Sequence, residues 1–295
     1  MTSPTFIIIG AHKAGTTSLY EYLSQHPQVY LPPIKETNYF AYEDAYASDG
    51  SYYPVRTWED YTALYKGAGS YRARGDVSPE YLLNHSSAWR IREALPDCKI
   101  IVSLREPISR AYSHYTDEFR TGARTGRHPP LAEDVNLSER WVRAGLYYSH
   151  LKHYYDLFPK TNILPVEFDM IIKDPQKTAS RIFEFIGVDP QLSVRSDTVY
   201  NAGGLPRQAF LFNVLRKTRL GALMKHYAPP RVRTAFSTAK ARLLKHITRA
   251  APELPEETAQ ELASLYFREI LLLQGLVGID LHYWLDRNPA YPTSP

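Results

Sequence analysis

Near the N-terminus, a short apolar run passes through a glycine loop directly into a helical pattern. Residues 5–9 predict a buried β-strand, and a helical pattern follows from Gly15 to about Pro27. The linking sequence GAHKAGTT, at 10–17, has its two glycines spaced as in a phosphate-binding loop. Backbone N–H groups of such a loop converge on an anion, and the dipole of the following helix favours negative charge there. The segment therefore predicts an α/β fold with an anion site after its first strand.

Two further apolar runs, at residues 99–104 and 162–166, also predict strands that are buried on both faces. Helical patterns follow them at residues 108–119 and 175–186. Strands that alternate with helices are typical of a parallel sheet with helices on its faces. We therefore expect an α/β fold with a P-loop-type parallel β-sheet flanked by helices.

Length and composition favour one domain. The 295 residues are 44% hydrophobic, which suits a packed core and excludes a disordered chain. We expect residues 1–200 to form the α/β core and residues 201–295 a basic, helical C-terminal extension of the same domain. A single cysteine, Cys98, excludes a disulfide framework. Neither a signal peptide nor a run of about 20 apolar residues is recognisable, so we expect a cytoplasmic protein.

Charge is distributed unevenly along the chain. The formal net charge is +4, yet residues 207–249 contain eleven Lys and Arg and no acidic residue, so the rest has seven more acidic than basic side chains. This asymmetry predicts an anionic partner near the C-terminal third. Three interpretations stay open: the segment closes over an anionic ligand, contacts an anionic membrane surface peripherally at its inner face, or is a solvated helical face. We expect no nucleic-acid partner, and the sequence leaves the oligomeric state open.

The lysine of the glycine loop does not stand where ATP-hydrolysing loops have it. Thr16 occupies that position, and the lysine is Lys13, inside the loop. This displacement argues against ATP hydrolysis and suits a nucleotide that has no third phosphate. Three consecutive hydroxyl residues, Thr16, Thr17 and Ser18, lower the helix propensity but are good donors to an anion. A glycine turn with an exposed lysine is the competing interpretation, and the loop alone does not decide between them.

A second candidate anion site follows the strand at 99–104. Arg105 stands at the carboxyl end of this strand, where ligands bind in open α/β sheets. Ser113 lies two helical turns further on, so an arginine and a hydroxyl are available for a second phosphate. Alternatively, Arg105 is a surface residue paired with Glu106.

Four motifs in order give the chain a resemblance to the PAPS-dependent sulfotransferase family, above all to its bacterial and heparan-sulfate-type branch. PAPS is 3′-phosphoadenosine 5′-phosphosulfate. The resemblance covers about residues 5 to 190. The motifs are KAGTTS at 13–18, KETNYF at 35–40, GDVSP at 75–79, and LREP at 104–107 with Ser113.

The resemblance implies a role for individual residues. Lys13 assists the departure of the bridging oxygen, and Arg105 with Ser113 holds the 3′-phosphate. Glu36 is the general base, and Asp76 helps to orient the acceptor. The loop that binds the 5′-phosphosulfate consists of Lys13, Ala14, Gly15, Thr16, Thr17 and Ser18, and we add Arg207 as a further phosphate contact. Val77 stands where the heparan enzymes usually have a lysine.

The function implied is transfer of a sulfuryl group from PAPS to a hydroxyl of a glycan, glycolipid or secondary metabolite, with release of PAP. No metal is expected. Two alternatives remain: a nucleotide or small-molecule kinase that uses the same loop, and a non-catalytic module that binds anions or lipid. His12, His85 and His114 are alternative bases, and a solvated ion pair with Lys35 is the competing interpretation of Glu36.

Overall fold

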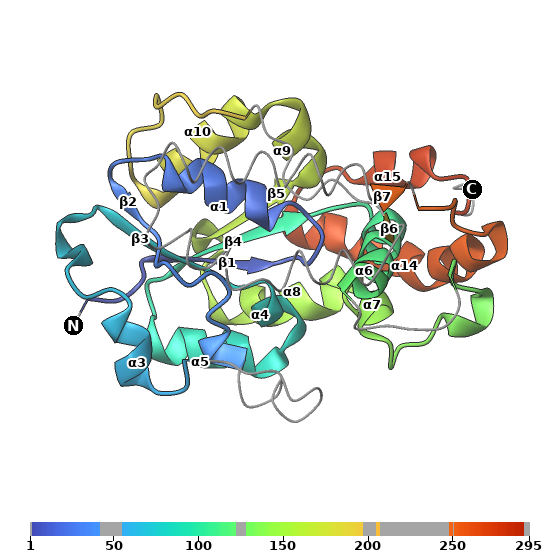
Figure 1. The fold of residues 1–295 in the computed structure, drawn as a ribbon, viewed down its shortest axis with the longest axis horizontal. Helices are drawn as coiled ribbons and strands as arrows, with labels where there is room; N and C mark the ends of the chain where they lie inside the picture. Colours follow the sequence, from blue (N-terminus) through green and yellow to red (C-terminus); the bar gives the residue numbers. More distant parts are fainter. Residues whose placement is uncertain are drawn as a thin grey trace.

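A five-stranded parallel sheet forms the centre of the computed structural model (Figure 1). The structure describes residues 2–41, 55–121, 128–196, 205–206, 248–249 and 251–291. The strand order is β2-β3-β1-β4-β5, so the first strand lies in the middle. The strands are β1 (Phe6–Gly10), β2 (Val29–Tyr30), β3 (Ala73–Val77), β4 (Lys99–Leu104) and β5 (Ile163–Glu167).

Both faces of the sheet are buried, because β1 alternates between two apolar clusters. Phe6 and Ile8 belong to the cluster under one layer of helices, and Ile7 and Ile9 to the cluster under the other. The first layer consists of α1 (Thr16–Ser24), α9 (Phe168–Lys173) and α10 (Pro175–Ile186). The second consists of α4 (Glu80–Leu83), α5 (His85–Ala94) and α8 (Tyr147–Leu157).

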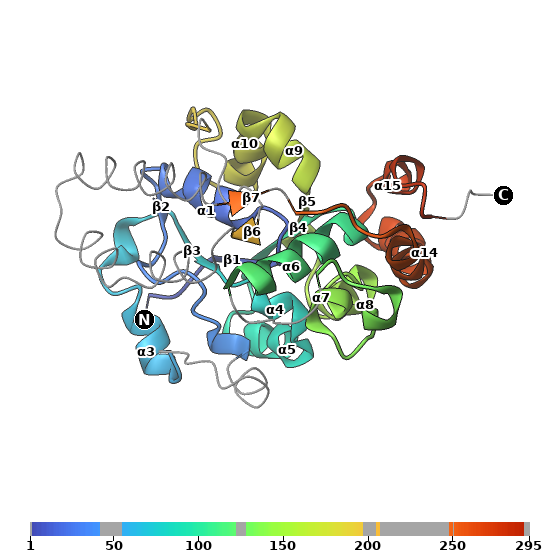
Figure 2. The ribbon, with the colours of Figure 1, turned by 45° about the vertical axis from the view of Figure 1, so that its right-hand side comes forward.

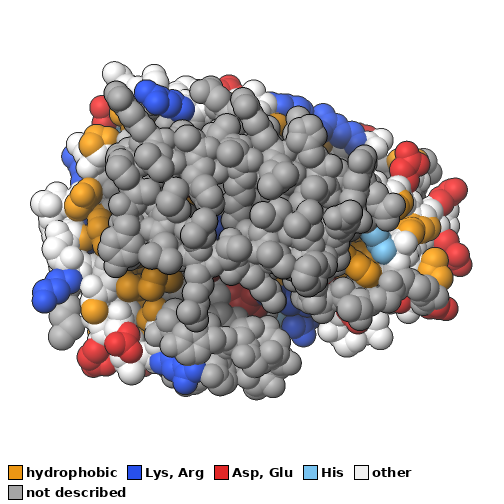
Figure 3. All heavy atoms as spheres, in the orientation of Figure 1, with side chains coloured by type: hydrophobic (Ala, Val, Ile, Leu, Met, Phe, Trp, Pro, Cys, Tyr) orange, Lys and Arg blue, Asp and Glu red, His pale blue; other side chains and the backbone are white. Residues whose placement is uncertain are grey.

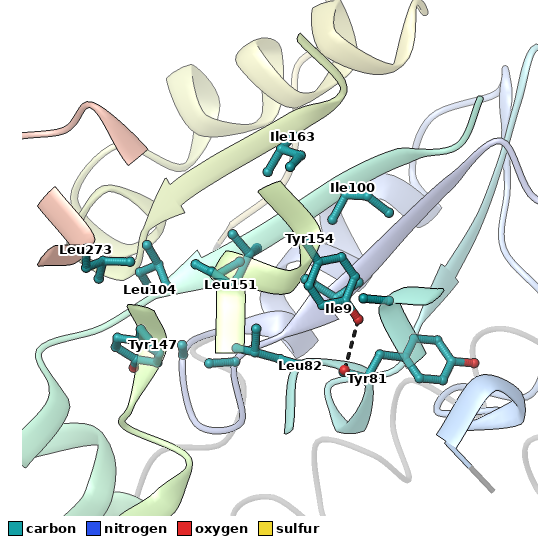
Figure 4. Packing of buried hydrophobic residues seen from close by; sticks show 14 of the residues in the cluster. Ile9, Tyr81, Leu82, Ile100, Leu104, Tyr147, Leu151, Tyr154, Ile163 and Leu273 are labelled. Carbon is teal, nitrogen blue, oxygen red and sulfur yellow. Dashed lines mark hydrogen bonds between the residues drawn. The ribbon is translucent and has the colours of Figure 1, made fainter. Parts of the chain in front are cut away.

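Tyrosines join the second helical layer to itself and to the sheet. Figure 4 shows Tyr154 of α8 beside Ile9 and Ile100 of the sheet, with its hydroxyl directed at α4. That hydroxyl donates to the carbonyl oxygen of Tyr81 over 2.9 Å. A buried tyrosine needs such a partner, and here the partner fixes α4 against α8. Short elements complete the core: α3 (Trp58–Ala63), η1 (Tyr39–Ala41), η2 (Ala68–Ser70), η3 (Ala132–Asp134) and η4 (Lys160–Asn162).

The carboxyl end of the sheet is covered by helices from distant parts of the sequence. Figure 1 shows α6, α7, α14 and α15 toward one end of the molecule, and Figure 2 shows α14 and α15 outermost there. A two-stranded antiparallel pair lies against α6, and its strands flank the basic segment. These elements are α6 (Pro107–Thr121), α7 (Arg140–Arg143), β6 (Leu205–Pro206), β7 (Thr248–Arg249), α14 (Glu256–Val277) and α15 (His282–Arg287).

The structure confirms the predicted α/β fold and the helical C-terminal extension, and it adds two strands to the central sheet and the separate pair of β6 and β7. The apolar runs at 5–9, 99–104 and 162–166 form β1, β4 and β5. The prediction missed β2 and β3; β3 has the sequence ARGDV, without an apolar run. The division into a core of 1–200 and an extension of 201–295 stays a prediction. Among the described residues, no helix combines the length and the apolar character needed to cross a membrane.

The C-terminal helices that the structure describes are not basic. Helix α14 has four glutamates and one arginine. Figure 3 shows acidic side chains over the end of the molecule that α14 and α15 form. The basic character predicted for the extension therefore belongs to residues 207–249, of which 207–247 lie outside the described residues.

Candidate active site

The glycine loop joins the carboxyl end of β1 to the first turn of α1. Gly15 precedes α1 with a φ of 88°, in the left-handed region. A Cβ atom at Gly15 would lie 3.0 Å from Cδ2 of Phe168 and 3.2 Å from Cδ1 of Ile171. Both the backbone angle and the packing therefore require glycine. The backbone N–H of Ala11 donates to the carbonyl oxygen of Ser103 over 2.8 Å, which ties the loop to β4.

Lys13 lies between the loop and α6. Its Nζ is 3.2 Å from Oδ2 of Asp117, which also pairs with Arg120. Burial lowers the pKa of Lys13, although the charge of Asp117 opposes this. Burial acts to raise the pKa of Asp117, but the charges of Lys13 and Arg120 outweigh it and hold that pKa below its ordinary value. Sequence reasoning missed Asp117, which lies four residues after Ser113 on the same face of α6.

Arg105 is held beside the loop by two contacts. Its Nη1 donates to the carbonyl oxygen of Lys13 over 3.1 Å, and its guanidinium lies 4.7 Å from the centre of the Phe168 ring. Phe168 begins α9, directly after β5. The loop after β1, the end of β4 and the start of α9 therefore meet at Arg105. Phe168 is a second residue that sequence reasoning missed.

Glu106 does not serve as the surface partner of Arg105 that the alternative interpretation assumed. Its carboxylate accepts hydrogen bonds from the backbone N–H groups of Ile108, over 2.8 Å, and Ser109, over 2.7 Å. Glu106 therefore caps the N-terminus of α6, where a negative charge is favourable. Ser113 lies on α6, one turn before Asp117, and the contact of Asp117 with Lys13 turns this face of the helix toward the loop.

Glu36 lies close to the glycine loop, joined to it through Lys35. The Nζ of Lys35 is 2.9 Å from Oε1 of Glu36 and 3.0 Å from Oγ1 of Thr17. The backbone N–H of Glu36 donates to the carbonyl oxygen of Val77 over 3.0 Å. The Glu36 side chain is 45% exposed, so its carboxylate can reach a ligand. The structure thus brings the predicted base and the predicted anion loop together.

Asp76 is fully buried at the carboxyl end of β3, and four hydroxyl groups donate to it. Its carboxylate is therefore enclosed by the groups that donate to it, one of which is Thr37, next to Glu36. Burial raises the pKa of Asp76, although these hydrogen bonds oppose the rise. The donors are Ser78 over 2.8 Å, Tyr81 over 2.8 Å, Thr37 over 2.9 Å and Tyr61 over 3.0 Å.

The three histidines considered as alternative bases have other surroundings. His12 Nε2 lies 3.1 Å from Oε2 of Glu80 and 3.1 Å from Nη2 of Arg140. His114 is stacked on His12, with ring centres 5.6 Å apart, and burial holds its pKa well below the ordinary value. His85 lies at the start of α5, in ring contact with two histidines of α8. Glu36 therefore stays the better-placed candidate.

Arg207 follows β6 directly but lies outside the described residues. In the part of the chain that the structure describes, no group of three or more His, Cys, Asp or Glu side chains is arranged to hold a metal ion.

A parallel sheet whose middle strand leads through a glycine loop into a helix defines a P-loop-type α/β protein, and here Lys13 and Arg105 place two cationic side chains at that loop. The family model described as "Sulfotransferase domain" matches residues 3–202. The chain belongs to this family, whose members use PAPS as the sulfuryl donor.

Individual relatives agree with this assignment. Over 199 residues the chain is 31% identical to heparan sulfate glucosamine 3-O-sulfotransferase 6 of Homo sapiens. The match covers 63% of this chain and 52% of that protein. It thus spans about half the length of that relative. The chain is 34% identical over 128 residues to the membrane-associated sulfotransferase kil1 of Dictyostelium discoideum. This match covers 43% of this chain and 26% of that protein.

Among solved structures, a sulfotransferase from Alicyclobacillus acidocaldarius matches with a TM-score of 0.69 and 24% sequence identity. The match covers 96% of this chain and 99% of the other. At this level of identity the likeness shows the fold.

Proposed function

We propose that the protein transfers the sulfuryl group of PAPS to a hydroxyl group of an acceptor and releases PAP. The observation that carries this proposal is that the ammonium group of Lys35 contacts both Glu36 and Thr17 of the glycine loop. A donor loop for an anion and a carboxylate base then lie next to one another. The cations and hydroxyl groups around the loop fit a nucleotide that has a charged group at its 3′ and at its 5′ position.

On the donor side, the loop from Lys13 to Ser18 binds the 5′-phosphosulfate through backbone N–H groups and hydroxyls. Lys13 stabilises the negative charge that develops on the leaving oxygen. Arg105, steadied by the ring of Phe168, holds the 3′-phosphate together with Ser113. Arg207 is a further proposed phosphate contact; the strand before it lies against α6, the helix of Ser113.

On the acceptor side, Glu36 accepts the proton of the attacking hydroxyl, a role that accelerates a reaction by roughly 10²–10⁴-fold. Asp76 keeps Glu36 in place through Thr37, rather than by touching the acceptor. The rest of catalysis is positioning, because the acceptor oxygen must attack in line with the departing phosphate oxygen.

We propose a hydroxyl of a glycan, glycolipid or secondary metabolite as the acceptor. The similarity to heparan sulfate glucosamine 3-O-sulfotransferases supports a glycan. The basic segment 207–249 provides a peripheral contact with an anionic membrane, at the inner face if the protein is cytoplasmic. The name of the Dictyostelium relative, described as membrane-associated, supports this.

The direct test is incubation of the protein with isotopically labelled PAPS and a metabolite extract, followed by mass spectrometry for products that carry the label. We expect labelled sulfate esters and an equal amount of PAP. Turnover of ATP with Mg²⁺ in place of PAPS would favour the kinase alternative instead.

A further inference from the structure

Lys35 occupies a position that an ordinary surface ion pair with Glu36 does not explain. Its Nζ lies 2.9 Å from Oε1 of Glu36 and at the same time 3.0 Å from Oγ1 of Thr17. Thr17 belongs to the first turn of α1, whereas Lys35 and Glu36 lie between β2 and η1, 18 residues further along the chain. One ammonium group therefore connects the donor loop to the proposed base.

The backbone is fixed at both residues that Lys35 contacts. Glu36 is anchored by its N–H bond to Val77, and it holds a left-handed φ of 63°. Thr17 is fixed in the first turn of α1. The Lys35 side chain is 25% exposed, so it is not enclosed by the protein. An ammonium has three N–H donors, and these two contacts use two of them.

We propose that Lys35 is a catalytic residue that holds the oxygens of the transferred sulfuryl group between the glycine loop and Glu36. This inference rests on the proposed function. In the reaction, the bond between sulfur and the bridging phosphate oxygen breaks, and its electron pair stays on PAP. A bond forms between sulfur and the acceptor oxygen, and the acceptor proton passes to Glu36. When the acceptor hydroxyl takes the place of Lys35 at Glu36, the Lys35 ammonium donates to a sulfuryl oxygen.

The test uses the difference between PAPS and PAP, because PAP lacks the sulfuryl group. In Lys35→Ala we expect kcat to fall by about 10²–10³-fold, the range for loss of one donor to developing charge. The Kd for PAP, measured by calorimetry, should stay within about twofold of the wild-type value. Lys35→Arg should recover part of kcat, because it restores a cation. Lys160→Ala is the matched control: this exposed lysine precedes β5, at the opposite end of the sheet, and its loss should change neither quantity.

Two results would overturn the role of Lys35 while leaving the proposed function intact. One is a wild-type kcat in Lys35→Ala. The other is a loss of PAP affinity as large as the loss of kcat, which would mean that Lys35 merely supports the loop. A wild-type protein that binds no PAP and transfers no sulfate would overturn the proposed function and this inference together.

Discussion

At the scale of single residues, the backbone is strained where the proposed chemistry lies. Lys13 and Glu36 adopt left-handed conformations, with φ of 66° and 63°. Asn38, with a φ of 52°, completes the set of non-glycine residues with positive φ in the described part of the chain. This conformation costs roughly 1–2 kcal/mol for an L-residue and persists only where the surroundings impose it. The loops that carry the proposed acid-base and leaving-group chemistry are therefore held rigidly.

Arg105→Ala tests the predicted 3′-phosphate site. A charge-assisted hydrogen bond contributes about 1.5–3 kcal/mol, so we expect PAP to bind roughly 10- to 100-fold more weakly. Calorimetric titration measures this directly. Adenosine 5′-phosphate, which has no 3′-phosphate, is the control ligand and should bind the variant and the wild type equally. Unchanged affinity for PAP would remove Arg105 from the site.

At the scale of elements, the base is positioned by the junction of β3 with the loop before η1. Asp76 of β3 binds Thr37 of that loop, while Tyr61 of α3 and Tyr81 of α4 donate to the same carboxylate. Hydroxyl groups from three other segments thus donate to the buried carboxylate of Asp76 at the end of β3. A buried carboxylate is tolerable only when it is hydrogen-bonded in this way.

Thr37→Val removes one of these donors without removing the charge. We expect the free energy of unfolding to fall by about 1 kcal/mol and kcat to fall because the loop that carries Glu36 loses one of its attachments to β3, with PAP affinity unchanged. Chemical denaturation and steady-state kinetics measure the two effects. Thr62→Val, whose hydroxyl donates to a carbonyl within α3, is the matched control. A wild-type kcat in Thr37→Val would contradict the anchoring role.

His150 links α8 to the end of α7 and makes the fold sensitive to acid. Its Nε2 lies 3.0 Å from the carbonyl oxygen of Arg143, and burial lowers its pKa to about 4 from 6.5. Below pH 6.5 the unfolded chain binds a proton that the folded protein does not. The free energy of unfolding should therefore fall by about 3 kcal/mol as the pH drops to about 4.

Denaturation at a series of pH values checks this expectation, with His150→Gln as the comparison. The variant should lose less stability than the wild type between pH 6.5 and 4, because it has no proton to bind there. Equal slopes in the two proteins would show that other groups cause the acid sensitivity.

The elements also show which features the sequence could predict. β1, β4 and β5 were predictable because buried parallel strands are continuous apolar runs. β3 was not, because Asp76 within it is buried through hydroxyl donors from residues 37, 61, 78 and 81 rather than by being apolar. The ion pair of Lys13 with Asp117 joins positions that are far apart in the sequence, so no local spacing predicts it. Arg105 was a candidate from its place at the carboxyl end of a strand, whereas Glu36 was singled out only through the family resemblance.

At the scale of the whole molecule, the charge asymmetry is now localised. Helices α14 and α15 are not basic, so the excess lies within residues 207–249. The strands that flank most of this segment, β6 and β7, pair with one another, and β6 lies against α6. The two ends of the segment are thus joined by the pairing of β6 with β7, next to α6, the helix that carries Ser113.

Reversal of charge at Arg216, Lys217 and Arg219 tests the proposed membrane contact. Each basic residue near an anionic surface contributes about 1 kcal/mol, so replacing all three with Glu should weaken binding to phosphatidylserine vesicles at least 100-fold. Co-sedimentation measures the binding, and uncharged vesicles are the control. Affinity for PAP should not change. Equal binding by the two proteins would leave the segment without a role at membranes.

The central claim is that this chain moves a sulfuryl group from PAPS to a hydroxyl, with Lys13 at the leaving oxygen and Glu36 as the base. The most direct measurement is the rate at which labelled sulfate passes from PAPS to acceptors, compared among the wild type, Lys13→Ala and Glu36→Gln. We predict transfer by the wild type, none by Lys13→Ala, and a loss of roughly 10²–10⁴-fold in Glu36→Gln. Wild-type rates in Lys13→Ala would contradict the claim, and undiminished turnover in Glu36→Gln would pass the role of the base to a histidine.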